Sequence, residues 1–255
     1  MSANVLFEAA DGIAIVTLNR PSAYNAVDLA TAEAISAALD ELDGRDDLKA
    51  GVITGAGGNF CAGMDLKALA STGERPIVAP RGGFGIVEQP PVKPLLAAVE
   101  GYALGGGFEI ALACDLIVAA SDARFGLPEV KRGQAAAAGG LVRLPRRIPY
   151  HVAMEVLLTG EALPPERAHQ VGLVNRLVEP GQALNVAVEL AATIAANGPV
   201  AVRVAKRVVV ESQDWPTEEA FDRQRPLVDA VRSSEDAREG ALAFVERRLP
   251  TWKNA

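Results

Sequence analysis

Short apolar runs alternate with segments of helical period along the first half of the chain. Residues 4–8 and 13–18 predict the two strands of a hairpin that turns at Asp11–Gly12. Asp28 is typical of a helix N-cap, and the apolar positions that follow it predict a helix over 29–42. Three further strands are predicted because their runs are short and wholly apolar, as where both faces of a sheet are covered: 50–54, 95–99 and 116–119.

The second half of the chain is mainly helical in pattern. Residues 71–91 are rich in Gly and Pro without a clear period, which predicts a mobile, lid-like loop before the helices begin. No internal repeat and no low-complexity tract interrupts the sequence. Beyond Pro149 the periodicity predicts these helices: 151–158, 164–171, 181–196, 199–212, 217–231 and 235–247.

A glycine triplet in the segment GYALGGGFEIALACD is the first candidate for chemistry. Gly105 to Gly107 precede the helical segment 108–113, although each glycine costs a helix interior about 1 kcal/mol. The start of a helix carries backbone N–H groups without intrahelical partners, and glycine lets a ligand approach them. Glu109 lies in the first helical turn. The pattern predicts a site for a developing oxyanion with a carboxyl group beside it.

Two other segments supply candidate partners for this site. The sequence GAGGNFCAGMDLKAL, residues 55–69, follows an apolar run and predicts a second strand, tight loop and helix. Two such turns with free N–H groups would clamp one carbonyl oxygen from two directions. In FGLPEVKRG, Pro128 suits the first turn of a short helix, or a loop corner, that aims Glu129. Each signal has a plainer alternative: tight glycine packing, a buried acid with a structural partner, or an ordinary first-turn acid.

Composition narrows the functional classes. The chain has 255 residues and a net charge of −7, which argues against non-specific nucleic-acid binding and an anionic membrane surface. No apolar run approaches the roughly 20 residues of a membrane span, and the first residues lack a signal-peptide pattern. Cys61 and Cys114 lie in apolar segments without metal-ligand spacing, so we expect reduced core thiols and no metal site. A cytoplasmic location is the default expectation.

Long, ordered motifs resemble one known family. AVEGYALGGGFEIALACDLIVAASDARFGLPEVKRG resembles the signature of the enoyl-CoA hydratase (crotonase) superfamily, and NFCAGMDLKAL resembles its acyl-CoA-binding segment. The resemblance runs from IAIVTLNRPSAYNAVD to FVERRLPTW, nearly the whole chain. It implies an α/β fold: a spiral of β–β–α turns over residues 1–195, with the active site, and a helical region over 196–255 for assembly into a homotrimer or a hexamer.

The resemblance also implies roles for individual residues. The N–H groups of Met64 and Gly106 would form the oxyanion hole, while Glu109 activates a water and Glu129 donates a proton to the substrate. Coenzyme A would be part of the substrate, with no separate cofactor. The implied CoA-binding residues are Ala62, Asp65 and Leu66 through their backbone, with Arg20 and Lys67 as candidates for phosphate contacts. The implied reaction is the reversible hydration of a 2-enoyl-CoA in fatty acid β-oxidation.

One segment departs from the commonest pattern of that family. After Gly133 the sequence is QAAAAGG, with Ala136 and Ala137 where hydratases often have Pro-Gly. This segment lines the acyl pocket in the family, so Gln134, Ala136 and Ala137 are candidate pocket residues, and LVRLPRRIPY resembles carnitinyl-CoA dehydratase-like members. Isomerase, hydrolase and decarboxylase chemistry and a non-catalytic CoA-binding role stay open. The triplet does not match G-x-G-x-x-G, which argues against a nicotinamide-dependent oxidoreductase.

Overall fold

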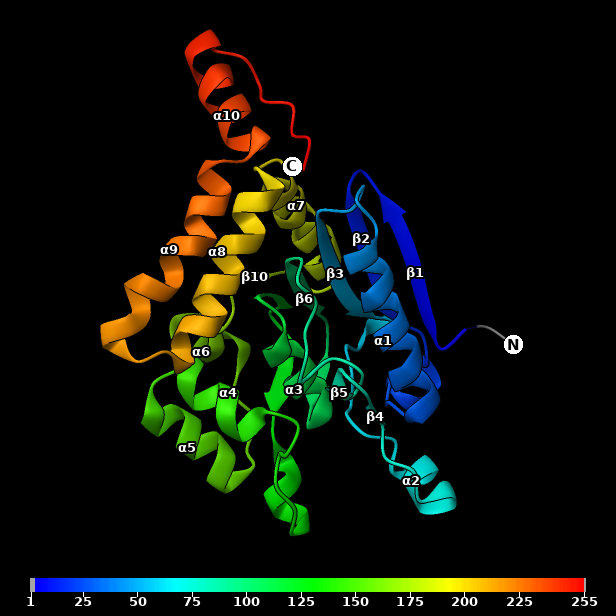
Figure 1. Cartoon of the computed structure of the whole chain (residues 1–255). Coiled ribbons are helices and arrows are strands. Elements are labelled where there is room, and N and C mark those ends of the chain that lie inside the picture. The colour runs from blue at the N-terminus through cyan, green and yellow to red at the C-terminus, as the bar shows by residue number, and fades with distance from the viewer. Residues whose placement is uncertain (1–2, 255) are drawn as a thin grey trace.

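A twisted sheet forms the centre of the molecule (Figure 1). The computed structural model describes residues 3–254, and within them six strands form this sheet in the order β1-β2-β3-β6-β8-β10. The first pair is antiparallel and all the others are parallel. The strands are β1 (Val5–Ala10), β2 (Ile13–Leu18), β3 (Ala50–Gly55), β6 (Leu95–Val99), β8 (Leu116–Ala120) and β10 (Arg176–Val178).

The central strands supply two hydrophobic cores, one on each face of the sheet. Successive side chains of a strand point to opposite faces, so neighbouring residues join different cores. Val52 and Leu96 pack against α7 (Ala183–Ala195) through its buried alanines. Ile53 and Leu95 belong to the larger core, to which α1 (Leu29–Gly44) and α3 (Gly106–Ala113) also contribute. The apolar strands predicted from the sequence are confirmed, and so is the Asp28 cap, whose side chain accepts from the N–H of Thr31.

A second, smaller layer of β structure lies at the ends of the main strands. β7 (Tyr102–Leu104) pairs in parallel with β9 (Arg124–Gly126), and single bridges join Cys61 to Ala103 and Phe125 to Leu163. The turn that starts at β6 adds one strand to the main sheet, then β7 to this layer, and then helix α3, and the turn that starts at β8 likewise adds β9 to this layer. This is the spiral of β–β–α turns that the sequence predicts.

The predicted helices of the second half are present with small shifts at their ends. An additional helix, α4 (Gly140–Arg147), is not predicted from the sequence, since Pro145 interrupts its pattern. The predicted helix over 217–231 begins with a short 3₁₀ turn, Thr217–Glu219, before α9. The other helices are α2 (Leu66–Thr72), α5 (Tyr150–Thr159), α6 (Pro165–Gln170), α8 (Pro199–Glu211), α9 (Ala220–Arg232) and α10 (Glu235–Glu246).

The segment 71–91 differs from the loop expected from its composition. It contains the short antiparallel pair β4 (Ile77–Val78) and β5 (Gly82–Gly83), and Phe84, Ile86 and Val87 are buried in the core. Arg81 is 4% exposed and pairs with Asp40 and Asp43 of α1. Local sequence patterns could not predict these ion pairs, because the partners of Arg81 are about 40 residues away in the chain.

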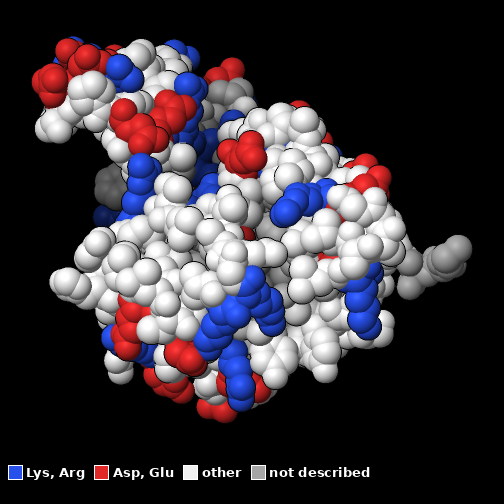
Figure 2. All heavy atoms as spheres, turned by 90° about the horizontal axis from the view of Figure 1, so that it is seen from below, with Lys and Arg blue, Asp and Glu red and all other residues white. Residues whose placement is uncertain are grey.

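Helices α8, α9 and α10 extend away from the sheet as an arm (Figure 1). Their buried residues are few, namely Pro199, Asp236 and Ala243. A domain boundary near residue 195 stays a prediction. Within residues 3–254 no single helix is long and apolar enough to cross a membrane, and one bent pair, Ala183–Ala195 with Pro199–Asp214, meets that test only by length and composition. Charged side chains of both signs are spread over the face shown in Figure 2, with large uncharged areas between them.

Candidate active site

The predicted site residues converge on one large cavity. It has a volume of about 1180 Å³ and lies between the turn before α2, the start of α3, the segment 75–92 and α4. Met64, Gly106, Glu109 and Glu129 all line it. The four residues to which the sequence assigns chemistry therefore face the same space.

Two loops bring the candidate amide donors together. Gly63 has φ +95°, and a Cβ atom there would lie 3.0 Å from the backbone nitrogen of Gly106, so the two turns are in direct contact. The neighbours of Met64 are fixed by Val27, which donates to the carbonyl of Gly63 and accepts from the N–H of Asp65. Among residues 3–254, neither the N–H of Met64 nor that of Gly106 donates a hydrogen bond. Both donors are thus free for a ligand oxygen.

Glu109 is a buried carboxyl group at the wall of the cavity. It lies in the first turn of α3, all of whose residues are buried, and it is 3% exposed. Its Oε1 accepts a hydrogen bond of 2.9 Å from the N–H of Gly140. Burial raises the pKa of Glu109 to about 7, and the negative charge of Glu129 adds to the rise, while the Gly140 N–H opposes it. A carboxyl group with this pKa can accept and release a proton near neutral pH.

Glu129 reaches the cavity from a different element. It follows Pro128 in the 3₁₀ helix Pro128–Arg132, and its Oε1 lies beside Gly105, where a Cβ atom would come within 3.0 Å of it. Its Oε2 is buried without a hydrogen-bond partner among the described residues. Burial raises the pKa of this carboxyl group as well. An unpaired buried carboxyl oxygen is costly unless a ligand completes its hydrogen bonds, which indicates a substrate contact.

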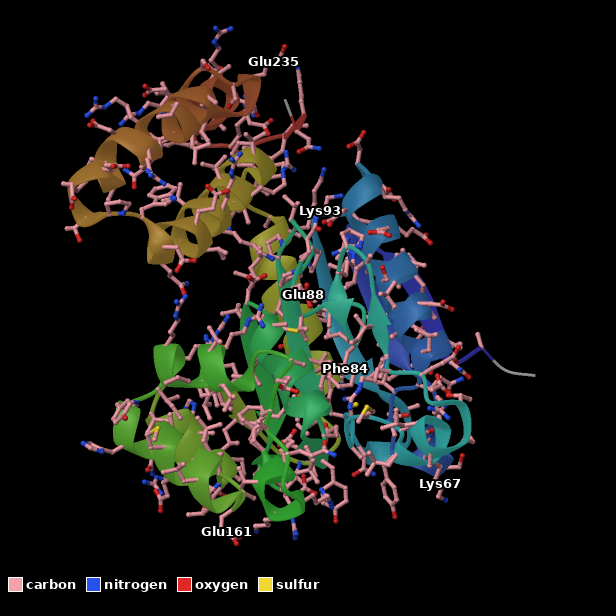
Figure 3. All side chains as sticks on the ribbon, turned by 60° about the horizontal axis from the view of Figure 1, so that its bottom comes forward. Lys67, Phe84, Glu88, Lys93, Glu161 and Glu235 are labelled. Carbon is pink, nitrogen blue, oxygen red and sulfur yellow. The ribbon has the colours of Figure 1, made fainter. Side chains whose placement is uncertain are left out.

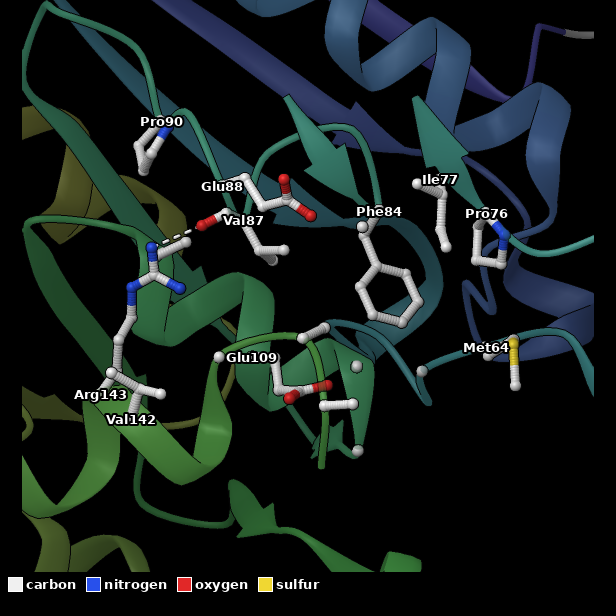
Figure 4. A pocket seen from close by; sticks show the side chains of 18 of the residues that line it. Met64, Pro76, Ile77, Phe84, Val87, Glu88, Pro90, Glu109, Val142 and Arg143 are labelled. Atoms are coloured by element: carbon white, nitrogen blue, oxygen red, sulfur yellow. Dashed lines mark hydrogen bonds between the residues drawn. The ribbon is translucent and has the colours of Figure 1, made fainter. Parts of the chain in front are cut away.

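Arg143 and Phe84 are among the cavity-lining residues that were not found from the sequence. Arg143 of α4 donates from its guanidinium to the carbonyl of Val87, the contact drawn as a dashed line in Figure 4, and burial lowers its pKa. Phe84 projects from the segment 82–85 into the same space (Figure 4). No local pattern marks either residue, because each meets the site only through contacts between distant segments.

The candidate CoA-binding residues fall into two groups. Ala62 and Leu66 line the cavity. The side chain of Asp65 instead caps the N-terminus of α2. The guanidinium of Arg20 forms ion pairs with the carboxylates of Asp65, at 2.8 Å, and Asp28, at 3.2 Å. Lys67 is exposed at the edge of the molecule (Figure 3). A phosphate contact from Arg20 would have to compete with two carboxylates, so this assignment stays a prediction that the geometry does not favour.

The segment QAAAAGG forms another part of the wall. Gln134 and Ala137 line the cavity. Ala136 is 4% exposed and lies behind the wall, and a Cβ atom at Gly140 would come within 3.0 Å of its own Cβ. Of the three predicted pocket residues, Ala136 is therefore a packing residue next to Gly140. Within residues 3–254 no group of three or more His, Cys, Asp or Glu side chains has the geometry to hold a metal ion.

Comparison with known proteins agrees with this geometry. The family model described as "Enoyl-CoA hydratase/isomerase" matches residues 8–255. The chain belongs to this family. The predicted superfamily and its hydratase chemistry are thereby confirmed, while the roles of single residues stay predictions.

Curated relatives and solved structures cover almost the full chain. Enoyl-CoA hydratase EchA19 of Mycobacterium tuberculosis is 41% identical over 251 residues, covering 94% of this chain and 92% of the relative. (E)-benzylidenesuccinyl-CoA hydratase of Thauera aromatica is 39% identical, with 98% and 99% covered. Carnitinyl-CoA dehydratase of Salmonella arizonae is 43% identical, with 93% and 94% covered. The crystal structure of enoyl-CoA hydratase EchA1 from Mycobacterium marinum superposes with a TM-score of 0.97 at 54% identity over all of both chains.

Proposed function

We propose that this protein is an enoyl-CoA hydratase that adds water reversibly to the double bond of a 2-enoyl-CoA thioester. One observation carries the proposal: two free backbone N–H groups, from Met64 and Gly106, line a single cavity together with the buried carboxyl group of Glu109 and the half-buried one of Glu129, whose Oε2 is buried. Hydration of a conjugated thioester requires this set, because charge develops on the carbonyl oxygen while two protons move.

The two backbone N–H groups stabilise the negative charge that develops on the thioester oxygen during the reaction. When water attacks the β-carbon, electron density moves through the α-carbon to the thioester oxygen and gives an enolate-like state. The N–H groups of Met64 and Gly106 bind that oxygen, and each such donor is worth about 3 kcal/mol in a site that excludes water. Because both are backbone groups, the shapes of the two turns matter more than the side chain at Met64.

The two carboxyl groups divide the proton transfers. Glu109, with a pKa of about 7, accepts a proton from the attacking water, whose oxygen bonds to the β-carbon. Glu129 donates its proton to the α-carbon, and the carbonyl double bond re-forms. In dehydration the roles reverse, and the water leaves with the proton of Glu109. The raised pKa of Glu129 supports its role as the proton donor, since burial favours its neutral form.

The substrate brings coenzyme A with it, and the protein needs no other cofactor for this chemistry. Ala62 and Leu66 line the cavity and are proposed to hold the CoA chain through their backbone, and the exposed Lys67 is a candidate for a phosphate contact. The arm of α8 to α10 is proposed to assemble the chain into a trimer or a dimer of trimers. Its exposed apolar side chains Phe221, Phe244 and Val245, with Leu249 just after α10, support this proposal. A cytoplasmic role in fatty acid β-oxidation is proposed on the same resemblance.

A second candidate is the dehydration of a carnitinyl-CoA-like substrate. The relatives of that name are 42–43% identical. Ala136 and Ala137 stand where hydratases often have a Pro-Gly pair, and the polar Gln134 beside them lines the cavity. A polar side chain at this wall would suit an acyl group with a polar head.

The test is an assay of the purified chain with crotonyl-CoA and crotonobetainyl-CoA, following the absorbance of the conjugated thioester. We expect loss of this absorbance with crotonyl-CoA without any added cofactor, and formation of 3-hydroxybutyryl-CoA. Faster turnover of crotonobetainyl-CoA would select the second candidate. No turnover of either substrate by a folded protein would contradict both.

A further inference from the structure

The ring of Phe84 lies directly on the oxyanion residue Gly106. A Cβ atom at Gly106 would come within 2.0 to 2.6 Å of the ring atoms Cζ, Cε2 and Cε1 of Phe84, so the tip of the ring already fills that space. Gly106 is the first residue of α3, and its φ is not positive. The helix would therefore accept a side chain at this position, and the ring of Phe84 is what excludes one.

Phe84 is held in this position by its neighbours. Its φ is +55°, a conformation that is uncommon for a bulky residue, and its N–H donates to the carbonyl of Pro76. Gly85 packs so closely on α1 that a Cβ atom there would lie 2.1 Å from the carbonyl of Ala32. The ion pairs of Arg81 with Asp40 and Asp43 fix the chain just before this turn. A side chain presented by such an anchored turn acts as a fixed wall.

The ring lies among other side chains that line the cavity. Figure 4 shows Phe84 between Met64, Pro76 and Ile77 on one side and Val87 and Glu109 on the other. It is 7% exposed, although its ring lines the cavity. In the proposed complex the thioester oxygen is bound by the N–H groups of Met64 and Gly106, so the substrate atoms nearest the ring are those next to the carbonyl carbon.

We propose that Phe84 is a specificity-determining residue that limits the bulk of the acyl group at the α-carbon. This inference rests on the proposed hydratase function. In this proposal the ring, which already fills the space beside Gly106, leaves room for a hydrogen on the α-carbon and too little for a methyl group. The proposed effect of Phe84 is confined to the α-carbon, so chain length beyond the β-carbon should not depend on this residue. The substrate class assigned to the site is thus 2-enoyl-CoA thioesters without an α-branch.

The test compares crotonyl-CoA with its α-methyl analogue tiglyl-CoA and with the longer 2-hexenoyl-CoA. In Phe84→Ala we expect the ratio of kcat/KM for tiglyl-CoA to that for crotonyl-CoA to rise at least tenfold over the original protein. The ratio for 2-hexenoyl-CoA should stay within twofold. Phe84→Leu, which keeps more of the buried contacts, should give an intermediate rise and guards against a folding defect in the alanine variant.

A matched control is Ile77→Ala, which removes another apolar side chain that lines the cavity but is 59% exposed. In this variant the ratio of kcat/KM for tiglyl-CoA to that for crotonyl-CoA should not change. If the original protein hydrates crotonyl-CoA while both Phe84 variants keep the tiglyl-CoA to crotonyl-CoA ratio of kcat/KM within twofold of the original value, Phe84 does not determine specificity, and the hydratase function stands. If the original protein hydrates none of the three thioesters, the proposed function itself fails, and this inference with it.

Discussion

The carboxylate of Glu109 accepts a hydrogen bond from the backbone N–H of Gly140, 2.9 Å away. Gly140 is the first residue of α4, so this N–H has no acceptor within its own helix. The bond fixes Oε1 of the buried carboxyl group. The proton acceptor is thus oriented by an element that follows it by 31 residues in the chain.

Replacement of either carboxyl group tests the proton transfers. Glu109→Gln and Glu129→Gln should each lower kcat for crotonyl-CoA hydration at least about 100-fold, because a positioned acid or base contributes that much. In Glu109→Gln the side-chain amide oxygen can still accept from Gly140, so the fold should be kept. Glu88→Gln is the control, since Glu88 lines the same cavity but is exposed. Near-normal turnover in a folded Glu109 or Glu129 variant contradicts the assigned roles.

The pH dependence of hydration should reveal the pKa of Glu109. This residue must be ionised to accept a proton from water, and its pKa is raised to about 7. We therefore expect kcat/KM for crotonyl-CoA to rise as the pH increases from about 5.5 and to level off only above about 7. An unperturbed glutamate, with a pKa of about 4.3, would already be ionised at the start of this range. A flat profile between about pH 5.5 and 7.5 would exclude Glu109 as the base that limits the rate.

Arg143 should lower the pKa that this profile reports. Its positive charge opposes the rise in the pKa of Glu109, and the guanidinium is held near the site by the carbonyl of Val87. Arg143→Met should therefore shift the acidic limb of the kcat/KM profile to higher pH. Arg146→Met is the control, because Arg146 lines the cavity from the same helix but pairs with Asp214 at the surface. Equal profiles for the two variants would show that the charge of Arg143 does not reach Glu109.

Much of the fold follows from local patterns in the sequence. The hairpin, the capped helix α1 and the strands β3, β6 and β8 are encoded by periodicity and by short apolar runs, and the structure contains them all. The glycine triplet and Glu109 predict the start of α3 as a site, since both act within one helical turn. These features need no knowledge of distant contacts.

The rest of the site depends on contacts that no local pattern encodes. β7, β9 and β10 have three residues each, too few for a period of two to be recognised. Gly140 and Phe84 acquire their roles only when α4 and the segment 82–85 meet α3. Arg20 is a further example: a basic residue suggests a phosphate contact, which stays a prediction, whereas the sequence gives no sign of a carboxylate partner that lies 45 residues away.

The ionisation of Glu109 should also affect stability in a pH-dependent way. Its folded-state pKa is raised from 4.5 to about 7, so the folded protein disfavours the charged form. The loss in the free energy of unfolding caused by ionising this buried group is absent well below pH 4.5 and reaches its full size above about pH 7. Glu109→Gln removes it, so the free energy of unfolding of the variant relative to the original should increase by about 2 kcal/mol between about pH 5 and 8.5. Urea unfolding at fixed protein concentration measures this difference, and a constant value across the range contradicts the raised pKa.

The contact between Gly106 and Phe84 predicts a rescue by a second substitution. Gly106→Ala places a Cβ atom where the Phe84 ring lies, 2.0 Å from Cζ, while the N–H of residue 106 is kept. The ring or the start of α3 must move, so we expect kcat for crotonyl-CoA to fall at least about tenfold, since misplaced oxyanion donors lose their stabilising effect. Phe84→Ala in the same chain empties the space and should recover most of that loss. An active Gly106→Ala protein, or a double variant no better than the single one, would show that the ring does not determine the glycine at this position.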